Sequence, residues 1–184
     1  LRGPAPDAEL QAALRRRFVI APSRNFEQDP RFGVLALTEI ASRALSPAVN
    51  DPGTAIDILG RQMRLLAQWQ ERSPADVTFQ SLLVPPLRLS DLMTDAFAAI
   101  ARDGAGLIEV QVRLQKVLAG LVAQAPQVFG PDAQRLSERA VQLAEAALVL
   151  EEDRAALRKL AAELVTLRNT APRSDTAGPL PRLA

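Results

Sequence analysis

Apolar residues recur every three or four positions along most of this chain, which is the spacing of one face of an α-helix. Proline and glycine interrupt these stripes and divide them into about six or seven predicted helices. β-like composition is confined to residues 77–84, where we expect at most one short extended segment. The pattern therefore predicts an all-α fold, a multi-helix antiparallel bundle.

Two of the helix starts are specified by the same dipeptide, an aspartate followed by a proline. Proline suits the first helical position and forces Asp29 and Asp51 out of the α region, so that each carboxylate can accept backbone N–H bonds of the first turn. We expect the first of these helices to end before Pro47 and the second near Arg72. The other predicted starts are Asp7, Ser90, Leu107 and Pro131.

Length and charge set the organisation of the chain. With 184 residues and 48% apolar content, we predict one helical domain over residues 1–169 and a disordered tail over residues 170–184. The chain begins with Leu1 and carries no apolar run long enough to span a bilayer, which suggests part of a longer protein. Its 22 basic and 21 acidic residues are evenly scattered, so nucleic acid is not expected as a partner.

The composition narrows the available chemistry. The chain has no Cys, no His and no Tyr, which excludes disulfides, thiolate nucleophiles, Ser-His-Asp triads and imidazole ligation of zinc. Acid-base work would rest on Asp, Glu or Lys, and no cofactor is expected.

The most distinctive segment contains RNFEQDPRFG followed by ALTEIASRALSPAVNDPGTAI. It resembles the hallmark of a family of predicted bacterial membrane proteins, the domain of unknown function 2254, with Ala48 and Val49 as small departures. The residues that carry the resemblance are Arg24, Gln28, Asp29, Phe32, Gly33, Ala44, Leu45, Ser46, Pro47, Asn50, Asp51, Pro52, Thr54 and Ala55. The resemblance implies transmembrane helices upstream, a place in the bacterial cell membrane, and no assigned activity. The basic residues 15–17 favour the cytoplasmic side for this domain.

Polar residues gather around the two Asp-Pro starts and form a candidate ligand site. They are Arg24, Gln28, Asp29, Arg43, Asn50, Asp51 and Thr54. One interpretation is a structural network in which the two arginines pair with the two aspartates. The other is a site for an anion or phosphate between two positive helix ends.

Three functions compete. The first is a soluble, membrane-proximal interaction, oligomerisation or gating domain that forms a homo-oligomer. The second is a sensor that binds an anionic small molecule at the Asp-Pro helix starts. The third is an enzyme that uses Asp29, Asp51 and Asp57 as acid, base or Mg²⁺ ligands. We rank the enzyme last and expect none, because a capping carboxylate already has its lone pairs engaged.

Overall fold

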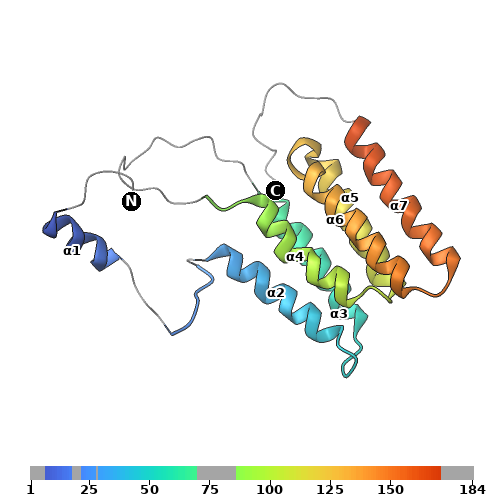
Figure 1. Cartoon of the computed structure of the whole chain (residues 1–184), viewed down its shortest axis with the longest axis horizontal. Coiled ribbons are helices and arrows are strands. Elements are labelled where there is room, and N and C mark those ends of the chain that lie inside the picture. The colour runs from blue at the N-terminus through green and yellow to red at the C-terminus, as the bar shows by residue number, and fades with distance from the viewer. Residues whose placement is uncertain (1–6, 18–21, 28, 70–85, 171–184) are drawn as a thin grey trace.

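The computed structural model describes residues 7–17, 22–27, 29–69 and 86–170. These residues form seven α-helices and no strand (Figure 1), which confirms the predicted all-α class. The helices are α1 (Ala8–Arg17), α2 (Pro30–Ala44), α3 (Pro52–Leu66), α4 (Leu89–Asp103), α5 (Ile108–Gln124), α6 (Pro126–Ala147) and α7 (Glu151–Thr170). The extended segment predicted at residues 77–84 lies outside the described residues, and so does the predicted tail beyond Thr170.

Helices α2 to α7 form two layers of three. Helix α4 packs between α2 and α6, whereas α5 packs between α3 and α7. Consecutive helices run in opposite directions, so the three helices of one layer point the same way (Figure 1). The layers are joined mainly where α2 meets α3, where α5 meets α6 and where α6 meets α7.

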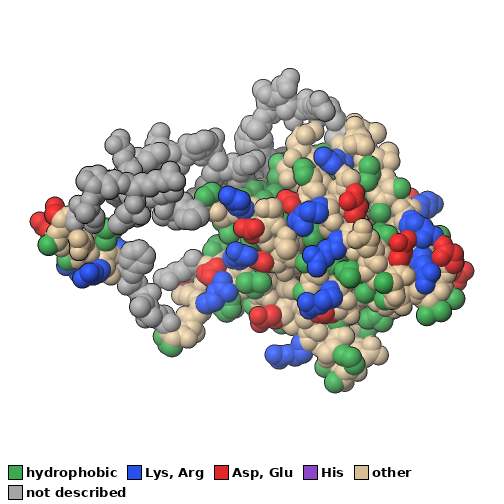
Figure 2. All heavy atoms as spheres, viewed as in Figure 1, with side chains coloured by type: hydrophobic (Ala, Val, Ile, Leu, Met, Phe, Trp, Pro, Cys, Tyr) green, Lys and Arg blue, Asp and Glu red, His purple; other side chains and the backbone are tan. Residues whose placement is uncertain are grey.

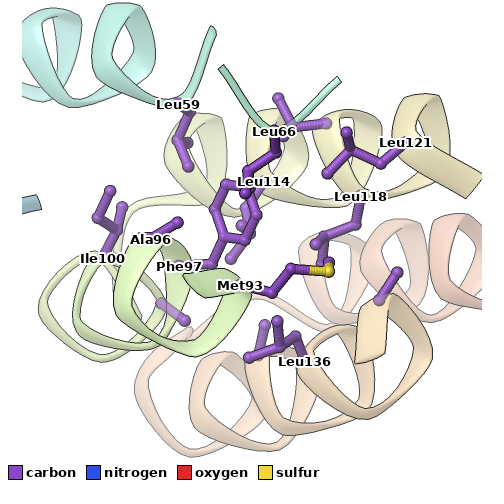
Figure 3. Packing of buried hydrophobic residues seen from close by; sticks show 14 of the residues in the cluster. Leu59, Leu66, Met93, Ala96, Phe97, Ile100, Leu114, Leu118, Leu121 and Leu136 are labelled. Atoms are coloured by element: carbon purple, nitrogen blue, oxygen red, sulfur yellow. The ribbon is translucent and has the colours of Figure 1, made fainter. Parts of the chain in front are cut away.

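The core lies between the layers. Phe97 of α4 lies at its centre among leucines of α3 and α5, and Met93 turns its sulfur toward Leu118 and Leu136 (Figure 3). Burying a side chain of this size stabilises the fold by about 1.5–3 kcal/mol. Helix α7 adds Leu157 and Leu164, which are both buried, whereas α1 buries none of its residues.

Two of the predicted helix starts are wrong. Helix α4 begins at Leu89 rather than after a Ser90 cap, and Ser90 lies in the first turn, where its carbonyl accepts the Thr94 hydroxyl. Helix α6 begins at Pro126 and continues through Pro131, which the sequence analysis took as its start. Proline fits both places because Pro126 needs no N–H partner in the first turn, and Pro131 frees only a carbonyl in an exposed turn.

The buried face of α2 also differs from the prediction. The helical spacing of Leu37, Ile40, Ala41, Ala44 and Leu45 predicts that these residues form one inward stripe. Ile40 is nevertheless 50% exposed, whereas Thr38 is buried. Polar Thr38 takes the inward place because its hydroxyl finds partners on the neighbouring helices, as described below. This exchange brings part of the distinctive segment to the boundary between α2 and α4.

Candidate functional site

The first Asp-Pro start is built around the carboxylate of Asp29. One oxygen accepts from Nε and Nη2 of Arg24 at 2.8 and 2.5 Å, and the other accepts from the backbone N–H of Phe32 at 3.0 Å. The Arg24 guanidinium lies 4.7 Å from the centre of the Phe32 ring, which stacks on Phe26. The hydrogen bond from Arg24 holds the pKa of Asp29 below its ordinary value of 3.8. The predicted pairing of Arg24 with Asp29 is therefore confirmed.

The second Asp-Pro start uses its own helix. Asp51 accepts from the backbone N–H of Thr54 at 3.0 Å and from the Thr54 hydroxyl at 2.5 Å, and this hydroxyl bond lowers the pKa of Asp51. Asn50 has a φ of 50°, a left-handed conformation that asparagine tolerates better than most residues. Arg43 is exposed and forms no ion pair with any described residue, so the predicted pairing with Asp51 is wrong.

The two starts lie at opposite ends of α2. The backbone N–H of Asp51 donates to the carbonyl of Ala44 at the end of that helix, whereas Asp29 caps its beginning. Fifteen helical residues separate the two ends, which corresponds to roughly 20 Å. The structure therefore places Arg24 and Asp29 in one group, and Arg43, Asn50, Asp51 and Thr54 in another. Gln28 lies outside the described residues. Because roughly 20 Å separates the two starts, one anion cannot contact both of them, as the second interpretation requires.

A shallow groove of about 430 Å³ runs across the layer formed by α2, α4 and α6. On α4 it is lined by Ala98 and Ala99, which have short side chains. The other residues around it are Leu35, Thr38, Glu39, Ser42, Thr94, Asp95, Arg102 and Arg139. Figure 2 shows this side of the molecule, where basic and acidic side chains lie interspersed over α2, α4 and α6.

Several polar groups of this groove already have partners. Arg31 at the start of α2 donates through Nε and Nη2 to the two carboxylate oxygens of Asp95 on α4, which raises the pKa of Arg31. The Thr38 hydroxyl lies 2.8 Å from the backbone carbonyl of Asp95 and 3.0 Å from Nε2 of the buried Gln62. Arg102 pairs with Asp103 beside the groove. The bonds of Arg31 and Thr38 to Asp95 fix α4 against α2.

Two charges of the groove remain without an ion pair among the described residues. Glu39 lies on the α2 wall and Arg139 on the α6 wall, and both residues are exposed. The groove therefore presents a free negative charge on one side and a free positive charge on the other. A partner surface would be electrostatically complementary to the groove if its positive charge faced Glu39 and its negative charge faced Arg139.

This groove was not predicted from the sequence. Arg31, Leu35, Thr38 and Ser42 follow helical spacing along α2, so their common face was readable in the sequence. The residues of α4 and α6 are 50 to 100 positions away, and no local signal shows that they lie beside that face. Within the described residues, no three Asp or Glu side chains gather closely enough to hold a metal ion.

These features define a helical bundle with a shallow groove lined by charged side chains. In the part of the chain that the structure describes, every helix is too short or too polar to cross a membrane. The chain belongs to the DUF2254 family of predicted membrane proteins, whose sequence model matches residues 2–120.

The similarity of this chain to curated relatives is confined to a short segment. Uncharacterized proteins of Mycobacterium bovis and of Mycobacterium tuberculosis strains CDC 1551 and H37Rv are each 44% identical to this chain over 55 residues. The match covers 30% of this chain and only 11% of each relative. No solved structure matches the chain.

Proposed function

We propose that this chain is a membrane-proximal interaction domain of a DUF2254 membrane protein, and that it pairs with a second copy of itself through the groove across α2, α4 and α6. The observation that carries the proposal is the pair of free, opposite charges on the two walls, Glu39 and Arg139. In this view the domain lies on the cytoplasmic side of the cell membrane and works by assembly rather than by catalysis.

A two-fold contact makes this groove complementary to itself. Under such symmetry, residue i of one copy meets residue j of the other, and j then meets i. Glu39 of each copy would face Arg139 of its partner, so both free charges are paired twice. The short side chains of Ala98 and Ala99 in the groove would leave room for a side chain of the partner.

The experiment measures self-association of the full chain by sedimentation equilibrium and native mass spectrometry. Glu39→Arg and Arg139→Glu each place like charges against each other, and each is expected to weaken the dimer by about tenfold or more. The double variant restores opposite charges in the reversed order, and it is expected to recover most of the affinity. Lys159→Glu, on the outer face of α7, is the control and should leave the dimer unchanged.

Two results would contradict this proposal. A chain that stays monomeric at every concentration has no such contact. A double variant that is as weak as the two single variants together would show that Glu39 and Arg139 do not meet across a two-fold axis.

A further inference from the structure

A glycine in the middle of α3 marks a second site, on the opposite layer. Gly60 is buried where α3 crosses α5. A Cβ at this position would lie 3.0 Å from Nη2 of Arg113 and 3.7 Å from Nη1 of Arg64. Glycine inside a helix costs about 1 kcal/mol of stability relative to alanine. Its lack of a side chain leaves room beside α3 for the guanidinium of Arg113.

Two cationic side chains thus converge above one glycine. Neither Arg64 nor Arg113 forms an ion pair with any described residue. The nearest acidic residues along the two helices do not neutralise them, because Asp57 pairs with Arg61 and Glu109 forms no ion pair with Arg113. Two like charges brought together without a counter-charge repel each other, so an anion at this place would stabilise the arrangement.

The buried part of Arg113 points to the same conclusion. Its Nε atom is inaccessible to solvent and has no hydrogen-bond partner among the described residues. An unsatisfied donor on a charged group costs more than one on a neutral group. Because solvent does not reach Nε, an anion would accept from the terminal atoms beside Gly60, Nη2 of Arg113 and Nη1 of Arg64, and its negative charge would offset the cost of the unsatisfied cationic group.

We propose that Arg64 and Arg113 bind a phosphate group over Gly60. The phosphate can belong to a soluble phosphorylated compound or to the headgroup of an anionic lipid, since both present the same oxygens. The site lies in the layer of α3, α5 and α7, whereas the proposed dimer groove lies in the layer of α2, α4 and α6. An experiment that disproves one of the two proposals therefore leaves the other unaffected.

The test titrates the full chain with inorganic pyrophosphate by isothermal calorimetry. In parallel, the chain is sedimented with vesicles of phosphatidylcholine alone or with added phosphatidic acid. Arg64→Gln and Arg113→Gln each remove a charge-assisted hydrogen bond and are expected to weaken binding by about tenfold or more. Lys159→Gln removes one positive charge from the outer face of α7 and is expected to bind like the wild type.

Two further measurements separate a loss of the binding site from a loss of charge or of the fold. Gly60→Ala keeps every charge but places a Cβ 3.0 Å from Nη2 of Arg113, so the guanidinium must shift and binding should weaken as well. Arg64 is exposed, so its variant keeps the fold even if the Arg113 variant does not, which circular dichroism checks.

Binding to pyrophosphate alone identifies a soluble ligand, whereas binding to phosphatidic acid vesicles alone identifies a lipid headgroup. Either result supports the site if Arg64→Gln weakens that binding. The proposal is overturned if neither probe binds, or if Lys159→Gln weakens binding as much as Arg64→Gln.

Discussion

At the scale of single residues, three aspartates act as local helix caps, and two of them precede proline. Asp7, Asp29 and Asp51 each accept a backbone N–H three residues further on. All three caps were predicted, because capping depends on a few neighbouring residues and not on the rest of the fold. The predicted ion pair between Arg43 and Asp51 does not form, because Thr54 already donates hydrogen bonds to both carboxylate oxygens of Asp51.

Acid should expose the contribution of the cap at Asp29. Its pKa is lower in the folded chain than the ordinary 3.8, so the ionised carboxylate stabilises the fold above that pH. This contribution is lost as the pH falls through the folded pKa. We expect Asp29→Asn to flatten the fall of the melting temperature between neutral pH and pH about 3.

The control for this measurement is Asp57→Asn. Asp57 forms an exposed pair with Arg61 of the same helix and caps nothing, so its variant should keep the wild-type slope. Equal slopes for Asp29→Asn and the wild type in thermal melts would show that the Arg24–Asp29 pair does not persist in solution.

At the scale of helices, buried polar side chains hold the elements in register. Gln62 of α3 donates to the Val34 carbonyl at 2.9 Å and to the Thr38 hydroxyl, and Gln111 of α5 donates to the Ala101 carbonyl of α4 at 3.0 Å. Gln115 of α5 and Ser137 of α6 bond each other. Each bond joins two different helices, so each fixes how far one helix can slide along its neighbour.

Replacing Thr38 by valine tests this role. Valine keeps the shape, but it removes the bond to the Asp95 carbonyl and leaves Gln62 with one partner fewer inside the core. We expect a loss of about 1–3 kcal/mol in the free energy of unfolding, measured with urea. Thr166→Val is the matched control, because the exposed Thr166 hydroxyl bonds only within α7. Similar losses for both variants would argue against a tether specific to Thr38.

At the scale of the whole molecule, α1 is separate from the core. It buries none of its residues, and Leu10 is 47% exposed, whereas α2 to α7 share the buried residues of both layers. A helix of ten residues is marginal alone in water. The predicted single domain over residues 1–169 therefore contains one helix that adds nothing to the described core.

Removing residues 1–17 should leave the bundle intact. We expect the truncated chain to melt at the same temperature as the full chain, within one degree or two as judged by circular dichroism at 222 nm, because no described core contact is lost. A drop of about 4 °C or more would correspond to roughly 1 kcal/mol and would show that α1 contributes to the fold.

The helical class, the Asp-Pro starts and the membership of a membrane-protein family could all be predicted from the sequence. These features depend on local spacing, on capping and on a short recognisable segment. The starts of α4 and α6 were predicted wrongly, because proline and serine are tolerated at several positions of a first or second turn.

Which side chains of different helices lie together depends on how the helices pack. Helix α2 itself holds the two Asp-Pro starts at its opposite ends, although the starts are close in the sequence. Packing of the helices places Glu39, Arg102 and Arg139 around one groove, and it places Arg113 beside Gly60. Periodicity shows which face of a helix is buried, but it contains no information about which other helix covers that face.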